Sequence, residues 1–154
     1  MANPDIPAAL VVLQAHLVAA GAALTDDILD VDRGLLATRG RQIRYYWGGE
    51  VEPVRMGPAH RVLNGELVGQ RFIIAAAWQL TDLTEALVTS IDVEMQQLAG
   101  EVRTRIQGDS TLGGNVTDLD LQYAEPDLIV IAGARHVVLR WDLDLAYIEY
   151  AVAQ

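Results

Sequence analysis

The sequence has no cysteine and no lysine, and it has only two serines among its 154 residues. Without cysteine, disulfides and thiolate metal sites are excluded, and nothing indicates an oxidising compartment. Without lysine, all 11 basic residues are arginine, and the lysine of a phosphate-binding P-loop is missing. Ser90 falls inside a predicted helix and Ser110 in a predicted turn, so neither is placed as the nucleophile of a Ser/His/Asp triad.

Positive charge is also scarce in this chain. There are 21 acidic residues against 11 basic ones, and the formal net charge is −10 at pH 7. An acidic surplus opposes general binding to a nucleic-acid backbone and favours solubility. Hydrophobic residues nevertheless make up 51% of the chain, which is typical of a folded domain rather than a disordered one. We therefore expect one soluble domain over residues 1–154.

The apolar run Ala8–Leu24 has the composition of a candidate membrane or export segment. Gln14 and His16 interrupt this run, and no basic segment precedes it, as a signal peptide would require. We expect instead a first helix over Pro7–Ala20, with one apolar stripe buried against a sheet. Gly21 suits the C-terminal cap of that helix.

A second helix is predicted over Leu83–Gln107. Asp82 and Glu85 have the spacing of a capping box at its start. Its apolar stripe consists of Leu87, Ile91, Met95, Leu98, Val102 and Ile106. The ideal helical step would fall on Glu94 rather than on Met95. The helix is expected to end at Gly108.

Strands are predicted around these two helices. They lie within Asp26–Asp32 and at Arg41–Trp47, Gln70–Leu80, Asn115–Tyr123, Asp127–Ala132 and His136–Tyr150. Gln70–Leu80 is apolar on both faces, which is typical of a central strand. The last two strands are joined by a short link with Gly133 and should form an antiparallel hairpin. The phase of the last strand becomes unclear after Leu145, so we expect a bulge near Ala146.

These elements predict a single-domain α+β (α/β) fold. The sheet should be mixed and mainly antiparallel, because the chain offers only one long crossover. Both helices should pack on one face of the sheet. Gly34–Gly40 is predicted to be a loop.

The segment Gly48–Gly69 interrupts this regular pattern. It is rich in glycine, and its apolar residues are scattered, with a short strand conceivable at Val51–Met56. We expect it to be poorly ordered in the isolated subunit and to become ordered against a neighbouring subunit. The candidate interface residues are Arg44, Trp47, Arg55, Met56 and Arg61, because arginine and aromatic residues dominate interfaces. The alternative is a surface loop that folds back on its own sheet as a hairpin.

The arginines of this region have candidate partners in the acid-rich C-terminal half of an adjacent copy. The first 69 residues carry six arginines and eight acids, and the remaining 85 carry five arginines and thirteen acids. The arginine-rich half of one copy would therefore suit the acidic half of the next. The alternative role for these arginines is loop solubility.

Four aspartates form the remaining candidate site. Asp118 and Asp120 project from one face of their strand, as do Asp142 and Asp144. If the two strands are neighbours, the four carboxylates could bind a divalent cation or serve as an acid and base pair. The alternative is the solvated face of amphipathic strands.

The three histidines, His16, His60 and His136, have no metal-ligand spacing. The segment Thr111–Asn115 contains Leu-Gly-Gly but follows a helix, whereas a phosphate cradle precedes one, so it predicts a tight turn. We expect no catalytic residue, no metal and no cofactor.

The order of elements after residue 70 resembles the tail terminator (tail completion) proteins of long-tailed bacteriophages. A strand like Phe72–Leu80 runs into a capped helix, Leu83–Ile106. The turn Asp109–Val116, with Leu-Gly-Gly at its centre, leads to a strand and then to a hairpin that ends in Trp141–Tyr150. The resemblance covers residues 70–154, and the N-terminal helix is consistent with it.

The resemblance implies a structural virion protein rather than an enzyme. Such proteins form a ring, usually a hexamer, at the head-proximal end of the tail. The ring ends tube polymerisation and joins the head-completion or connector protein. The implied partners are other copies of the chain, the tail tube protein and that connector, with DNA only passing through the ring, no membrane, and assembly in the host cytoplasm.

Two alternatives stay open at this point. Within the same class, the chain is another connector of the phage neck or a tail tube subunit. In a different class, it is a small acidic enzyme or ligand-binding domain that uses the four aspartates.

Overall fold

The computed structural model describes residues 4–53, 65–81 and 84–150. Seven elements follow one another along the chain: α1 (Ile6–Ala22), β1 (Val31–Arg33), β2 (Arg41–Val51), β3 (Gly65–Gln79), α2 (Glu85–Gln107), β4 (Asp118–Ile131) and β5 (Ala134–Tyr150). The five strands form one sheet in the order β1-β2-β3-β5-β4. Only β1 and β2 pair in parallel, and all other pairs are antiparallel.

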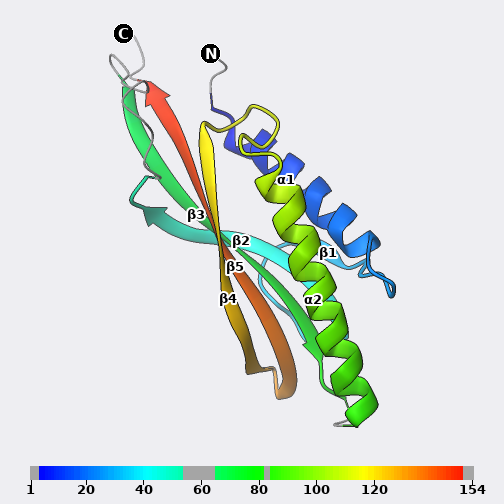
Figure 1. Ribbon diagram of the computed structural model, residues 1–154. Coiled ribbons are helices and arrows are strands. Elements are labelled where there is room, and N and C mark those ends of the chain that lie inside the picture. The colour runs from blue at the N-terminus through cyan, green and yellow to red at the C-terminus, as the bar shows by residue number, and fades with distance from the viewer. Residues whose placement is uncertain (1–3, 54–64, 82–83, 151–154) are drawn as a thin grey trace.

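Both helices lie on the same face of the strongly twisted sheet (Figure 1). Helix α1 contacts β1, helix α2 contacts β4, and the two helices contact each other. The predicted α+β fold, with a mixed and mainly antiparallel sheet and both helices on one face, is confirmed. In the described part of the chain, the other face of the sheet is therefore open, apart from the segment Gly34–Gly40, whose Leu36 packs on Ala75, Ala77 and Val138.

The core lies between the helices and the three central strands. Strand β3 contributes alternate residues from Phe72 to Trp78, and β5 contributes alternate residues from Leu139 to Leu145. The register places these two sets opposite each other, with Ile74 beside Trp141. Strand β3 also buries Ala75 and Ala77 on its other face, and it occupies the centre of the sheet, as its two apolar faces predict.

The end of α1 differs from the expectation. Gly21 is not the cap, because the helix continues to Ala22 and is capped by Ala23. The backbone of Ile28 packs directly against Gly21, and a Cβ at Gly21 would lie only 2.5 Å from the Ile28 carbonyl oxygen. The chain leaving α1 thus doubles back along it. Strand β1 is Val31–Arg33, so only Val31 and Asp32 of the predicted Asp26–Asp32 region lie in a strand.

Helix α2 begins and packs differently from the prediction. Its cap is Thr84, whose side chain accepts a hydrogen bond from the Leu87 N–H, so the expected capping box of Asp82 and Glu85 is wrong. Asp82 and Leu83 lie outside the described residues. The buried stripe passes through Glu94, whereas Met95 lies only partly buried at its edge.

Glu94 is buried because it satisfies two other side chains. One of its oxygens accepts from Arg41, at the start of β2, and the other accepts from the Trp78 indole N–H at 3.0 Å. Arg41 also donates to the carbonyl oxygens of Asp26 and Asp27, in the connection after α1. This polar cluster therefore joins α2, two strands and the α1–β1 connection.

The C-terminal sheet has one strand fewer than predicted. Asn115–Tyr123 and Asp127–Ala132 are not separate, because β4 runs through both with a register shift between Ala124 and Asp127. The bulge expected near Ala146 is absent, since β5 keeps its register with both neighbours there. The bulge sits in the edge strand instead, at Glu125 and Pro126, where proline and bulges are tolerated.

The long irregular segment Gly48–Gly69 is shorter than predicted. Strand β2 continues through a bulge at Gly48 to Val51, and β3 already begins at Gly65, so Val51 pairs with Gly69. The two strands form a hairpin arm, and the hairpin alternative is correct for these residues. Residues 54–64, including the second half of the possible Val51–Met56 strand, lie outside the described part of the chain.

The predicted turn after α2 is confirmed. Asp109 accepts from the Gly113 N–H, and the Thr111 hydroxyl accepts from the Gly114 N–H. Leu112 points into the core and is fully buried. The turn also contacts α1, because the Asp5 N–H donates to the Asn115 carbonyl oxygen.

Candidate interaction surface

The structure describes two of the five residues predicted to form an interface, and these two lie on opposite faces of the sheet. Arg44 lies on the open face of the sheet and is buried, and its guanidinium donates to the carboxylate of Asp30 at 2.7 Å. Trp47 is 57% exposed, and its indole N–H donates to Gln70 at 2.7 Å. Arg55, Met56 and Arg61 lie outside the described residues. Of the two that are described, only Trp47 presents its side chain to the surroundings.

The four aspartates lie on one face of the sheet, and arginine side chains lie among them. Asp120 lies opposite Asp144 in the pairing of β4 with β5. Arg71 forms a bidentate pair with Asp144, with contacts of 2.8 and 3.1 Å, and Arg140 binds Asp142 at 3.0 Å. These carboxylates alternate with guanidinium groups across the sheet, so the arrangement is that of an ion-pair ladder.

The hydrogen bond to Asp144 is the main reason why the pKa of Arg71 lies above its ordinary value. Among the described residues, no three histidine or acidic side chains are grouped in a way that could hold a metal ion. The cation-site alternative therefore has no support from the geometry of the described strands.

The three histidines lie far apart in the sequence, and the two that are described make different contacts. His16 on α1 contacts Asp109, in the turn after α2, at 2.8 Å. That hydrogen bond is the largest cause of a lowered pKa for Asp109, and the Gly113 N–H lowers the pKa further. His136 is fully buried and contacts the Ala134 carbonyl oxygen through Nδ1. His60 lies outside the described residues.

The outer face of α1 is apolar although it faces away from the core. The helix contains no Asp, Glu or Arg along its length. Its exposed positions recur at helical spacing and consist of Pro7, Val11, Ala15, Val18 and Ala22. Val11 is 71% exposed. An apolar helix face normally packs against another element, and no described residue covers this ridge.

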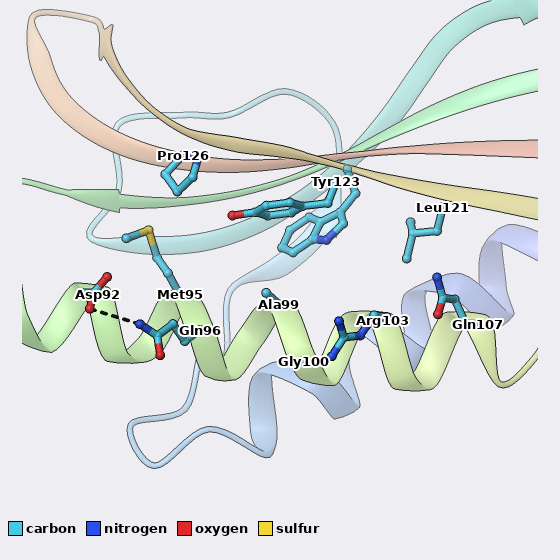
Figure 2. A pocket seen from close by; sticks show the side chains of 11 residues that line it. Asp92, Met95, Gln96, Ala99, Gly100, Arg103, Gln107, Leu121, Tyr123 and Pro126 are labelled. Carbon is cyan, nitrogen blue, oxygen red and sulfur yellow. Dashed lines mark hydrogen bonds between the residues drawn. The ribbon is translucent and has the colours of Figure 1, made fainter.

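A groove lies on the other side of the helical layer, between α2 and β4. Figure 2 shows Met95 and Ala99 of α2 facing Leu121 and Tyr123 of β4 across it. The apolar lining is Met95, Ala99, Leu121, Tyr123, Pro126 and Trp141, and the groove has a volume of about 470 Å³. The rings of Tyr123 and Trp141 lie 6.1 Å apart. Polar side chains, including Gln96 and Arg103, form its rim.

The apolar surface continues beyond the groove along the outer strand. Tyr123, Leu128 and Val130 of β4 are all more than half exposed. Leu128 lies opposite Val137, on the side of the sheet that carries the helices. Exposed apolar residues in a contiguous patch indicate an interaction site. In the sequence, these exposed residues were visible only as the alternating apolar residues of β4. That alternation alone does not show which face of the strand is buried and which is exposed.

Three backbone donors on the two outer strands are satisfied by neighbouring side chains. The N–H groups of Arg33, Leu119 and Leu128 each donate to the side chain of the aspartate just before them, at 2.8 Å. Such local bonding reduces the tendency of an edge strand to recruit another strand. Side-chain packing is therefore the better candidate for association than extension of the sheet.

Among residues 4–53, 65–81 and 84–150, neither helix combines the length and the apolar character needed to cross a membrane. No protein family and no curated protein matches the sequence. One solved structure of similar shape is 13% identical, with 97% of this chain and 99% of that chain covered and a TM-score of 0.48, and its name indicates no function. This likeness does not assign the chain to a family.

Proposed function

We propose that this chain is a tail terminator protein of a long-tailed bacteriophage. In that role it is a structural, non-enzymatic subunit of a ring at the head-proximal end of the tail. The ring ends polymerisation of the tail tube, presents a surface to the head-completion or connector protein, and lets DNA pass. The chain would be assembled in the host cytoplasm and remain in the virion.

The observation that carries this proposal is the position of two apolar surfaces on opposite sides of one small domain. The α1 ridge lies on the β1 side of the sheet, and the α2–β4 groove lies at the β4 edge. Two different surfaces on opposite sides produce a head-to-tail contact, and such contacts close into rings when the rotation permits. A ring subunit requires this arrangement, whereas a monomeric enzyme does not.

The resemblance found in the sequence supports the same function. The elements that carry it are β3, α2, the Leu112-Gly113-Gly114 turn and the β4–β5 hairpin, which follow one another in this order, with the single strand β4 in place of the two strands expected before β5. Another neck connector or a tail tube subunit, also structural proteins of the tail, remains the second candidate. The enzyme alternative is weaker, because arginines engage Asp142 and Asp144.

The proposal is tested by tagging and by deletion in the phage or prophage that encodes the chain. A gold-labelled tag on the chain should mark the head-proximal end of each tail in electron micrographs. Deletion should give tubes that overgrow and fail to join heads. Label spread along the whole tube would identify a tube subunit instead, and normal joined tails without the chain would reject the proposal.

A further inference from the structure

We infer that the apolar ridge of α1 packs into the α2–β4 groove of a second copy of the same chain. The ridge comprises Pro7, Val11, Ala15, Val18 and Ala22. This inference deepens the proposed function, on which it rests for the closure of the ring, by naming the two faces that meet. The contact is heterologous, because the ridge and the groove are different surfaces.

The two surfaces match in shape. The ridge consists of small and β-branched side chains on one helix, so it is narrow and allows close approach of the backbones. The groove is an elongated hollow between a helix and a strand, with an apolar floor and a volume of about 470 Å³ (Figure 2). Helices pack by placing the side-chain ridges of one element into the grooves of another.

A single copy cannot make this contact with itself. Helix α1 packs on one side of α2, and β4 packs on the other, so α2 separates the ridge from the groove of the same chain. The next copy presents a ridge of matching chemistry. Successive copies would then be related by one repeated operation, which gives a ring when the rotation closes, as the proposed function requires.

Charge around the two surfaces favours the same pairing. Asp32 and Arg33 are both exposed beside the ridge, where they line a hollow with Pro7 and Val11. Asp92 and Arg103 line the groove. Arg33 of one copy would attract Asp92 of the next across a head-to-tail contact, and Asp32 would attract Arg103.

The absence of native cysteine allows a direct test by cross-linking. Ala15→Cys places a thiol on the ridge, and Gln96→Cys places one on the rim of the groove, at residues that are both exposed. With a short bis-maleimide linker, a mixture of the two single variants should give cross-linked dimers, and the double variant should give a ladder of larger species. Each single variant alone should give none.

A charge variant tests the same contact without a linker. Val18→Arg should weaken association at least about tenfold, because it buries an unpaired charge in the contact. Val93→Arg on α2 is the matched control, since Val93 does not line the groove and the two valines are 46% and 47% exposed. Association of the control should stay within about twofold of the unmodified chain. Sedimentation measures association, and thermal unfolding checks that both variants fold.

Several outcomes would overturn the inference. Dimers from Ala15→Cys alone would show that two α1 ridges meet each other, and a monomer at high concentration would show that the ridge has no such partner. An assembled oligomer without ridge-to-groove cross-links would reject these faces while leaving the proposed function intact. If rings form through the ridge and the groove but the phage makes normal tails without the chain, the proposed function is rejected and the inferred contact is still supported.

Discussion

Glu94 occupies a position on the buried stripe of α2 that an apolar residue would normally fill. Its carboxylate accepts hydrogen bonds from Arg41 and from the Trp78 indole N–H. In the sequence, the only sign of this buried acid was the spacing from Ile91 to Met95, which departs from the ideal helical step. Its partner Arg41 is more than fifty positions away, so periodicity along one helix could not have predicted the pair.

This cluster leads to a prediction for the stability of the fold. Glu94→Leu would restore the apolar stripe but leave Arg41 and the Trp78 N–H without their acceptor. The free energy of unfolding should fall by about 2–3 kcal/mol. Glu94→Gln keeps acceptor capacity and should lose about 1 kcal/mol. Urea unfolding measures both values, and a Leu variant as stable as the unmodified chain would contradict this role.

His16 and Asp109 tie α1 to the turn after α2. Because the pKa of Asp109 lies below its ordinary value in the folded chain, its ionised form stabilises the fold. This contribution is fully present above the ordinary carboxyl pKa of about 4. It is lost as the pH falls through the lowered pKa.

Asp109→Asn isolates this contribution to stability. Its side-chain oxygen can still accept from the Gly113 N–H, while the ionised carboxylate that contacts His16 is removed. At neutral pH the variant should be about 1 kcal/mol less stable than the unmodified chain. The difference should shrink as the pH is lowered below about 4. A constant difference from neutral to strongly acidic pH, measured by chemical unfolding, would show that the ionisation of Asp109 is irrelevant.

At the scale of elements, the β4–β5 hairpin has an unusual turn. Ala132 and Gly133 both have positive φ, at 47° and 82°. This combination is that of a tight hairpin turn, in which asparagine at the first position and glycine at the second are favoured. Alanine at the first position is strained, because its Cβ disfavours a left-handed backbone.

Ala132→Asn should therefore stabilise the chain by about 0.5–1 kcal/mol, since asparagine tolerates the left-handed backbone. Gly133→Ala is the opposing variant and should destabilise the chain by about 1 kcal/mol. A Cβ at Gly133 would meet nothing within 4 Å, so any loss reports backbone strain alone. Thermal unfolding measures both variants, and equal stability of all three proteins would contradict the turn assignment.

The elements that could be predicted are those with a clear period. The stripe of α2 and the two apolar faces of β3 indicated their type and their place in the sheet. Boundaries depended on contacts distant in sequence. Strand β1 is short because Ile28 packs on Gly21, and β4 is continuous because β5 pairs with it on both sides of Pro126. Neither contact leaves a local signal.

The candidate site could be predicted only in part, for a similar physical reason. Arginine content indicated an interface, but Arg44 finds its partner in Asp30 within the same chain. The exposed apolar face of α1 was visible as a helix without charge, yet the same pattern is typical of a helix buried on both sides. Burial depends on the whole fold, so the groove between α2 and β4 became recognisable only once β4 was placed at the sheet edge.

At the scale of the whole molecule, the domain has an apolar ridge on one side and an apolar groove on the other. Association through the ridge and the groove buries both surfaces of every copy only when the last copy binds the first. A closed ring should therefore have one discrete mass that does not grow with concentration. Sedimentation at increasing concentration checks this, and the resemblance leads us to expect six copies. Open-ended growth would contradict closure.

The central claim, that the ring ends growth of the tail tube, is tested most directly by tail length. Electron microscopy would measure tails in a deletion strain supplied with the unmodified chain, with Val18→Arg, or with Val93→Arg. The account predicts overlong tubes in the deletion strain and with Val18→Arg, and one uniform length with the other two. Uniform tails of normal length in the deletion strain would contradict it.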